Sequence, residues 1–278
     1  MYVFDAIDPL REYLFNLKQT DTTIAFVPTM GALHNGHESL IKYAQTLADE
    51  VIVSIFLNPI QFAPNEDLQC YPRPLHDDKH LCKNLDVSAL FLPSEATIYP
   101  SNSLLTQVTV PTLSTLYCGQ SRPNFFQGVT NVVIRLFNII QPHYSVFGEK
   151  DYQQFVIIKT CVQNLFLPIT VYSVPTIRDS NGLALSSRNN YLSDTEKNEA
   201  SSIYQSLCLV KEAVSNGIHD SLSLNRLIKN NLSDSIAIDY IAYVDADTLL
   251  PSQTIKKGNR VLFAGTLNQT RLIDNLAI

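Results

Sequence analysis

The sequence predicts an α/β fold in which a parallel sheet precedes a smaller α+β domain. Two nearly all-apolar runs, 24–27 and 51–57, flank a segment with helical periodicity, which is the strand, helix, strand order of a parallel sheet. Neither run alternates with polar residues, so both strands are expected to be buried on both faces. The order of predicted elements changes after Arg188, where two helices precede two strands. We therefore expect a Rossmann-like domain over residues 1–176 and a smaller α+β domain over 177–278 that closes over the active site.

The composition is that of a globular enzyme rather than of a nucleic-acid binder. The 278 residues are 45% hydrophobic and 17% charged, with a formal net charge of -6, whereas nucleic-acid binders carry a basic balance or stripe. Five cysteines without a CxxC spacing argue against a disulfide framework or a cysteine zinc site. The first residues do not resemble a signal peptide, and no apolar stretch reaches membrane-spanning length. We therefore expect a cytoplasmic protein that acts neither on nucleic acid nor at a membrane.

The first elements predicted along the chain are a helix, a buried strand and a second helix. Residues 9–17 have amphipathic periodicity, and the apolar strand 24–27 follows. Pro28 and Gly31 are expected to break this strand into a short loop. Asn35 is a suitable N-cap for the helix after it, in which apolar residues recur at helical spacing.

Two histidines, His34 and His37, flank the amino end of this second helix, three residues apart and on one side. Free backbone N–H groups and the positive end of the helix dipole gather there, so two imidazole donors beside them suit a phosphate. Gly36 would let a nucleotide approach the backbone closely. The HxxH spacing alone fits two surface histidines equally well, so the assignment depends on the rest of the chain.

Polar residues follow the second predicted strand, 51–57, at the same edge of the sheet as His34. Ligands of parallel sheets collect at the carboxyl ends of the strands, which points to Asn58 and Gln61. Their amides can donate and accept hydrogen bonds, which suits a small hydroxy acid. Turn residues that bond their own backbone fit the same spacing, so this alternative stays open.

Asp77 and Asp78 open a further helical segment, with His76 and His80 nearby. One interpretation is a metal cluster. The preferred one is a solvated helix start whose acids complement the helix dipole. A short strand is expected over 89–92.

Residues 101–126 are loop-rich, and helical periodicity returns over 128–140. The apolar segment 104–116 has few charges to keep it solvated. We expect this segment to lie near an interface between two subunits.

The next strand, 144–147, runs directly into a turn at Gly148 and a helix that starts at Asp151. Lys150 projects from the amino end of that helix, where it can contact phosphate oxygens, while a carboxylate there can accept bonds from ribose hydroxyls. A solvated helix start is the alternative.

The strand predicted over 169–174 is followed by an irregular stretch that ends in Ser186, Ser187 and Arg188. Two hydroxyls and a forked cation can hold the outer phosphates of ATP and follow them into a transition state. A turn without a phosphate is the alternative for this short motif. Helices over 194–216 and 222–231 and strands within 239–251 and 259–267 complete the prediction.

Several separated motifs, in order, resemble one family. PTMGALHNGH, residues 28–37, is similar to the HxGH signature of the nucleotidyltransferase superfamily that includes class I aminoacyl-tRNA synthetases, and in this extended form it resembles the pantothenate synthetase (pantoate:beta-alanine ligase) family. NPIQFAPNEDLQCYPR, RPNFFQGVTNVVIRLFNIIQP and GEKDYQQ resemble further stretches of that family, and LALSSRNNYLS resembles the KMSKS-type loop. DYIAYVDADTLLP and TRLIDNLAI extend the resemblance to nearly the whole chain. Three positions depart from the family pattern: Phe125 replaces the usual histidine, Asn181 an aspartate and Leu185 a methionine.

The resemblance implies ATP-dependent condensation of (R)-pantoate with beta-alanine through a pantoyl adenylate, releasing AMP and pyrophosphate, in pantothenate biosynthesis. It also implies Mg²⁺ accompanying ATP, no prosthetic group, and a homodimer. Gln61 and Gln154 are implied to bind pantoate with Asn58 beside them, and Asp77 and Asp78 to lie near the magnesium. The implied ATP-binding residues are Met30, Gly31, His34, Gly36, His37, Gly148, Glu149, Lys150, Asp151, Ile177, Leu185, Ser186, Ser187 and Arg188. The implied catalytic residues are His34, His37, Lys150, Ser186, Ser187 and Arg188.

Two other functions fit parts of the pattern. A nucleotidyltransferase that keeps the nucleotide on its product is disfavoured by Gln61 and Gln154, because both are expected beside the α-phosphate. A regulatory module that only binds nucleotide is disfavoured by the intact histidines, Lys150 and Arg188.

Overall fold

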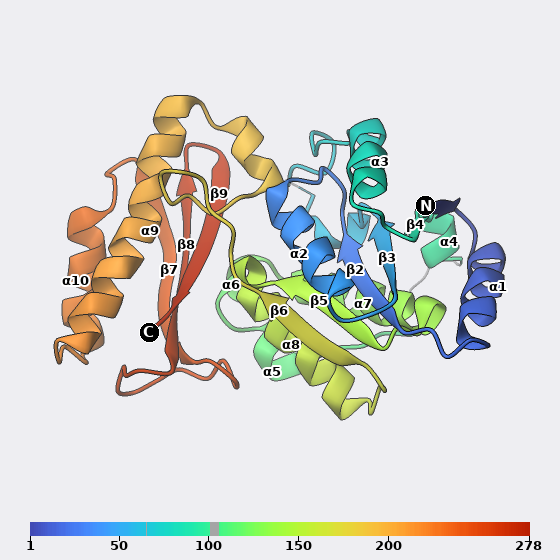
Figure 1. Ribbon diagram of the computed structural model, residues 1–278. Helices are drawn as coiled ribbons and strands as arrows, with labels where there is room; N and C mark the ends of the chain where they lie inside the picture. The colour runs from blue at the N-terminus through green and yellow to red at the C-terminus, as the bar shows by residue number, and fades with distance from the viewer. Residues whose placement is uncertain (65, 101–105) are drawn as a thin grey trace.

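The computed structural model describes residues 1–64, 66–100 and 106–278, in which a parallel sheet with its helices lies beside a smaller antiparallel sheet (Figure 1). The strand pairs of the larger sheet are parallel, and the strand order is β1-β4-β3-β2-β5-β6. Its strands are β1 (Tyr2–Phe4), β2 (Ile24–Thr29), β3 (Glu50–Ile55), β4 (Ala89–Phe91), β5 (Tyr144–Gly148) and β6 (Thr170–Val174). The predicted Rossmann-like parallel sheet is confirmed.

The sheet grows in opposite directions from β2. The chain adds β3 and β4 on one side of β2, whereas β5 and β6 lie on the other side. In open parallel sheets such a reversal leaves a crevice outside the carboxyl ends of the two central strands. The residues that follow β2 and β5 therefore share the position where this architecture binds ligands.

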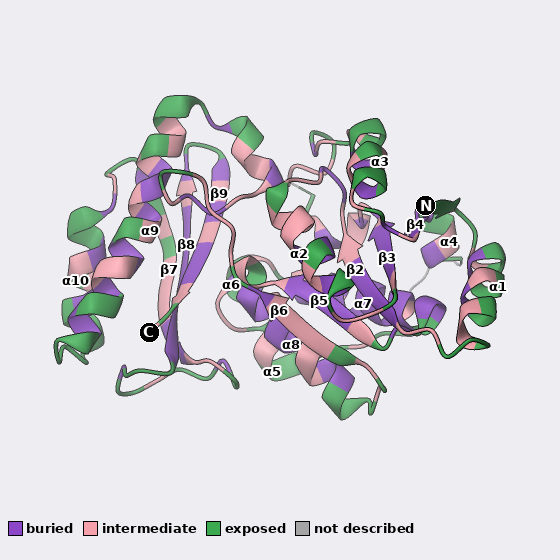
Figure 2. Cartoon of the chain, viewed as in Figure 1, coloured by how far each residue is buried: buried purple, intermediate pink, exposed green. Residues whose placement is uncertain are grey.

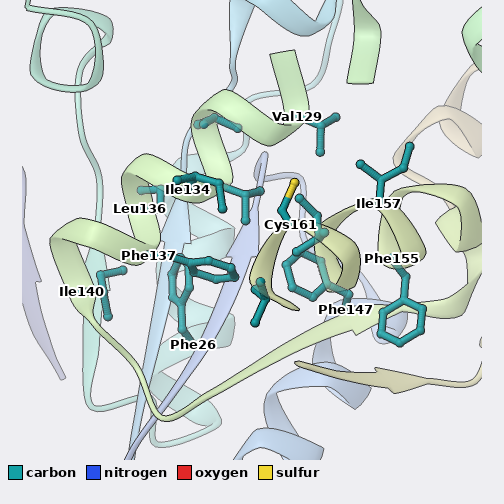
Figure 3. Packing of buried hydrophobic residues seen from close by; sticks show 14 of the residues in the cluster. Phe26, Val129, Ile134, Leu136, Phe137, Ile140, Phe147, Phe155, Ile157 and Cys161 are labelled. Carbon is teal, nitrogen blue, oxygen red and sulfur yellow. The ribbon is translucent and has the colours of Figure 1, made fainter. Parts of the chain in front are cut away.

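Helices cover both faces of the sheet, because alternate residues of β2 point into two separate cores. Ile24 and Phe26 join the helices α1, α7 and α8, while Ala25 and Val27 join α2 and α3. In Figure 3 the ring of Phe26 lies against that of Phe137, with centroids 6.2 Å apart. The helices of this body are α1 (Ile7–Lys18), α2 (Asn35–Gln45), α3 (Leu75–Asn84), α4 (Glu95–Ile98), α5 (Pro111–Ser114), α6 (Cys118–Ser121), α7 (Phe125–Ile140) and α8 (Tyr152–Asn164). The predicted burial of β2 on both faces is confirmed.

Two local features differ from the sequence prediction. Pro28 lies inside β2, in register with Ser54 of β3, although it was expected to end the strand. It is tolerated because the pairing of β2 with β5 involves only Ala25 and Phe26, so the missing N–H falls where the strand has one partner. The three-residue strand β1 was not predicted, since its residues are largely exposed and too few to show a period.

The smaller body packs two helices on a three-stranded antiparallel sheet of order β7-β8-β9. Its elements are α9 (Asp194–Ser215), α10 (Ser221–Asn231), β7 (Ile236–Asp245), β8 (Asn259–Leu267) and β9 (Thr270–Ala277). The helices bury one face against the sheet and expose the other (Figure 2). The predicted α+β character is confirmed, and β9 is an additional strand. A linking segment, residues 175–193, joins the two bodies and contains the 3-10 helix η3 (Ser187–Tyr191).

The expected interface segment, 104–116, is only partly described, since Leu104 and Leu105 lie outside the described residues. In the described part, Val108, Val110 and Leu113 pack against the core of their own chain. Within the described ranges, no helix combines the length and the apolar character that a bilayer crossing requires.

Candidate active site

A cavity of about 1100 Å³ lies between the carboxyl edge of the parallel sheet, the linking segment and β9. The predicted site residues that line it are Met30, His34, Gly36, His37, Gln61, Gly148, Lys150, Asp151, Gln154, Ile177, Leu185, Ser186, Ser187 and Arg188. Gly31, Asn58, Asp77, Asp78 and Glu149 were also predicted and do not line it. Most of the residues chosen from four distant motifs therefore meet around one space.

The two histidines form the start of α2. His34, not Asn35 as expected, is the N-cap, and its Nδ1 accepts a hydrogen bond from Gly36 N at 3.1 Å. The Nδ1 of His37 accepts from His34 N at 3.3 Å. Since both Nδ1 atoms are acceptors, the neutral rings carry their protons on Nε2. A Cβ on Gly36 would lie 2.7 Å from His34 Cε1, so the glycine makes room for the capping ring.

Both imidazoles are held neutral. Burial, followed by the charges of His34 and Lys150, lowers the pKa of His37 to about 3. Burial and the nearby Lys150 lower the pKa of His34 to about 4. At neutral pH the pair therefore offers two N–H donors without charge, and Lys150 supplies the positive charge beside them.

Asp78 fixes the loop between β2 and α2. Its carboxylate accepts hydrogen bonds from Ala32 N at 2.9 Å and Leu33 N at 2.7 Å. Asp78 is buried, with 2% of its surface exposed. Gly31 turns the chain here with φ of 85°. Asp78 thus orders the loop that leads to His34.

The expectation that Asp77 and Asp78 approach a magnesium ion is not supported. The Asp78 oxygens are engaged by backbone N–H groups, while the Asp77 side chain is 82% exposed and lies beside His76. Over the described ranges, no group of three or more His, Cys, Asp or Glu side chains could hold a metal ion. The solvated helix start preferred from the sequence fits the exposed Asp77 in the first turn of α3, but it is wrong for Asp78, which is buried against the loop before α2.

The turn after β5 presents Lys150 to the cavity. This turn is the 3-10 helix η2 (Glu149–Asp151), and Lys150 Nζ lies 3.9 Å from Asp151 Oδ1. Glu149, predicted to contact ATP, turns away from the cavity. Its carboxylate accepts hydrogen bonds from Ser173 Oγ at 3.1 Å and Arg260 Nη2 at 3.0 Å.

The three amides predicted to bind substrate separate into two roles. Asn58 is fully buried and donates to Gly128 O at 3.2 Å, while its Oδ1 accepts from Tyr99 Oη at 3.0 Å. It fastens the 3-10 helix η1 (Pro59–Gln61) to α7 and is not free for a ligand. Gln61 and Gln154 line the cavity. Contact of these two glutamines with a ligand stays a prediction, whereas the bonds of Asn58 give it a structural role.

Side chains of the linking segment reach the first body, among them Tyr191, whose Oη donates to Cys70 O at 3.2 Å. Ser187 Oγ donates to Ala32 O at 3.1 Å. The Arg188 guanidinium donates to both carboxylate oxygens of Asp67, at 2.9 and 2.8 Å. Ser186 caps η3 by accepting from Arg188 N at 3.3 Å. Sequence reasoning missed Asp67, although it lies within the stretch that begins at Asn58.

Phe125, which departs from the family pattern, supports an arginine at the cavity wall. The guanidinium of Arg122 lies 3.7 Å from the centroid of the Phe125 ring. Arg122 also donates to Glu66 at 2.6 Å and to Gln61 O at 3.0 Å. The ring therefore holds Arg122 against the backbone of a predicted ligand residue by stacking.

Comparisons with known proteins agree along the whole chain. A family model described as Pantoate-beta-alanine ligase matches residues 2–277. A pantothenate synthetase from Nitrosomonas europaea is 43% identical over 279 residues, covering 100% of this chain and 99% of the relative. The crystal structure of a pantothenate synthetase from Thermus thermophilus superposes with a TM-score of 0.93 at 39% identity, covering 100% of this chain and 99% of that one. A pantoate-beta-alanine ligase from Francisella tularensis, complexed with beta-gamma ATP and beta-alanine, gives a TM-score of 0.82 at 37% identity over 100% and 97% of the two chains.

Proposed function

The chain belongs to the pantoate-beta-alanine ligase family and condenses pantoate with beta-alanine using ATP, and we propose that it does so through a pantoyl adenylate. One observation carries the proposal. Two neutral imidazoles, Lys150 and the Ser186 to Arg188 segment meet at one cavity that Gln61 and Gln154 also line. Phosphate donors and amides suited to a hydroxy acid thus face the same space.

In the first step a carboxylate oxygen of (R)-pantoate attacks the α-phosphorus of ATP. The bond between this phosphorus and the oxygen that leads to the β-phosphate breaks, and pyrophosphate leaves. Negative charge grows on the phosphate oxygens in this transition state. The Nε2–H groups of His34 and His37 and the ammonium of Lys150 offset that charge as donors fixed before the reaction begins.

In the second step the free amine of beta-alanine attacks the acyl carbon of the adenylate. AMP leaves with the electrons of the acyl–oxygen bond, and the amine loses a proton to give the amide. Gln61 and Gln154 hold the pantoyl group in both steps through their amides. The Francisella ligase complexed with beta-gamma ATP and beta-alanine supports binding of both substrates by this family.

The departing pyrophosphate lies nearest the linking segment in this proposal. Ser186, Ser187 and Arg188 would hold its oxygens, and the closing of the smaller body would exclude water from the hydrolysable adenylate. We place the domain boundary at residue 176 for this motion. Small-angle scattering with and without ATP tests it, and equal radii of gyration would count against closure.

Magnesium is proposed to enter with ATP, bound to the phosphate oxygens that it prefers as ligands. The carboxylates of Asp77 and Asp78 do not fit a metal site, because one is bonded to backbone and the other is exposed. No step of the proposed reaction uses a metal bound by these two carboxylates. Asp77→Asn should leave the Mg²⁺ dependence of adenylate formation unchanged, and a clear shift would restore Asp77 as a ligand.

The cytoplasmic location and the homodimer stay proposals based on the family resemblance. The apolar segment 104–116 is the proposed contact region, although its described part packs against its own chain. Sedimentation that finds only monomer at high protein concentration would rule out the dimer.

Pyrophosphate release tests the adenylate route directly. With ATP and pantoate alone, the protein should release a burst of about one pyrophosphate per active site, because the adenylate stays bound. Adding beta-alanine should convert the burst into steady turnover. Pyrophosphate that appears only when beta-alanine is present would contradict a separate first step.

A further inference from the structure

Strand β9, at the edge of the smaller sheet that faces the first body, carries two buried polar residues in succession (Figure 1). Asp274 is 5% exposed and Asn275 is 4% exposed. Burying polar groups costs free energy unless they are bonded, so each is expected to have a specific partner. Each residue has partners outside the smaller sheet, on the turn that carries Lys150 or on the linking segment that leads to Ser186.

Asn275 holds the backbone of the turn that carries Lys150. Its Nδ2 donates to Glu149 O at 2.8 Å and to Lys150 O at 3.0 Å, which uses both amide hydrogens. Its Oδ1 accepts from Arg260 Nη1. Reversing the amide would set its oxygen against two carbonyl oxygens, so only one orientation satisfies all three bonds.

The turn itself has no cap of its own. Gly148 and Asp151, which precede η2 and α8, make no side-chain capping bond. The carbonyls of Glu149 and Lys150 accept hydrogen bonds from a side chain of the other body. Arg260 completes this contact by pairing with the Glu149 carboxylate at 3.0 Å and stacking 3.6 Å from the centroid of Tyr152.

Asp274 holds the linking segment in the same way. Its carboxylate accepts two bonds from the Arg178 guanidinium, at 2.6 and 2.8 Å, and one from Asn275 N at 2.7 Å. Arg178 in turn donates to Gly182 O at 3.1 Å. The segment that leads to Ser186 and Arg188 is thus fixed to the residue next to Asn275.

We propose that Asn275 is a positioning residue for Lys150, and that the Asp274–Asn275 pair sets the Lys150 turn and the linking segment in register with each other. The inference rests on the role of Lys150 in the proposed function. Both residues line the cavity, but their described side-chain bonds go to protein groups rather than into the open space. Asn275 acts through backbone carbonyls and Asp274 through Arg178. Displacing the pair would therefore shift the phosphate donors of Lys150 and of the linking segment, but it would remove none of them.

Asn275→Asp tests the proposal, because it keeps the volume and the acceptor for Arg260 but sets an oxygen against the two carbonyls. Asn259→Asp is the matched control, since Asn259 is 5% exposed in the neighbouring strand and its side chain bonds only Lys256 N among the described residues. Adenylate formation in a single turnover should slow about 10- to 100-fold in Asn275→Asp, as for a small misplacement of a catalytic group. The KM for pantoate should change less than about 3-fold, and Asn259→Asp should keep the unaltered rate.

A double-mutant cycle with Lys150→Ala separates positioning from a general structural role. If Asn275 acts through Lys150, Asn275→Asp should slow adenylate formation no further in the Lys150→Ala background. Losses that multiply, or an unaltered rate in Asn275→Asp alone, would overturn the proposal. If circular dichroism shows that Asn275→Asp does not fold, the double-mutant cycle is repeated with Asn275→Ser, which lacks the Nδ2 donor. The proposed function fails separately, if the unaltered protein forms no adenylate at all.

Discussion

The two phosphate-facing regions of the cavity are built by different kinds of contact. At the edge of the parallel sheet, His34 and His37 are oriented by bonds to atoms two and three residues away. In the linking segment, Ser187 and Arg188 are held by Ala32 and Asp67, which are 155 and 121 residues away. The histidine pair is therefore oriented within the first body, whereas Ser187 and Arg188 are held only where the linking segment meets that body.

This difference predicts different consequences for function. Donors fixed by local bonds cost little reorganisation when ATP binds, so they suit the reacting α-phosphate. Donors fixed by contacts across a junction can be withdrawn, so they suit the entry of ATP and the exit of pyrophosphate. Variants in each region can therefore separate the two roles.

The largest effect is expected at the sheet edge. His37→Asn keeps an acceptor for His34 N but removes the Nε2–H donor, and it should slow adenylate formation by about 10²- to 10³-fold. Single-turnover formation of pantoyl adenylate measures this. His76→Asn, at an exposed histidine, is the control. A loss confined to the KM for beta-alanine would contradict the assignment of His37 to the first step.

Arg188→Ala should produce a smaller loss, about 10²-fold in adenylate formation, because it removes one donor to pyrophosphate. Adenosine recognition should stay nearly intact, because the role proposed for Arg188 involves only the departing pyrophosphate. Binding of a nonhydrolysable ATP analogue by calorimetry measures the second part. Asp67→Asn, which loosens the guanidinium without removing it, should have an intermediate effect. An unaltered rate of adenylate formation in Arg188→Ala would mean that the linking segment does not act on the departing pyrophosphate.

The local region was largely predictable from sequence. A strand, a short loop and a helix start are encoded by neighbouring residues, so the positions of His34, Gly36 and Lys150 followed from periodicity and strand ends. The N-cap was assigned one residue too late, because an imidazole is a rarer cap than asparagine.

Long-range contacts were not predictable in the same way. No local pattern indicates that Asp78 bonds the loop before α2, that Glu149 pairs with Arg260, or that Asn58 bonds Gly128. Each partner is brought close only by the folded sheet or by the junction of the two bodies. Acidic and amide residues were therefore assigned to ligands when their partners lay elsewhere in the chain.

The glutamines test whether the sheet edge also selects pantoate. Gln61→Ala or Gln154→Ala should weaken pantoate binding by on the order of 1–3 kcal/mol, because each leaves a ligand group without its partner. Binding of the ATP analogue should change far less. Gln163→Ala, at an exposed position on the same helix as Gln154, is the control for α8. Equal losses for both ligands would count against the assignment.

The smallest predicted effect is on stability, and it also separates the two regions. Folding lowers the pKa of His37 from 6.5 to about 3, so below pH 6.5 the unfolded chain binds more protons there than the folded one. The contribution of a neutral His37 is thus complete above pH 6.5 and declines as the pH falls toward 3. Between pH 7 and pH 5.5 this amounts to about 1 kcal/mol of unfolding free energy. Urea denaturation at the two pH values measures this. From pH 7 to pH 5.5, the unfolding free energy of His37→Asn should fall by about 1 kcal/mol less than that of the unaltered protein. Arg188→Ala should show the same loss of unfolding free energy between the two pH values as the unaltered protein, because the guanidinium stays protonated at both.

The contradicting outcome is an identical pH dependence in His37→Asn and the unaltered protein. It would mean that the fold does not hold the imidazole neutral. The sheet edge would then not be a preformed pair of neutral donors.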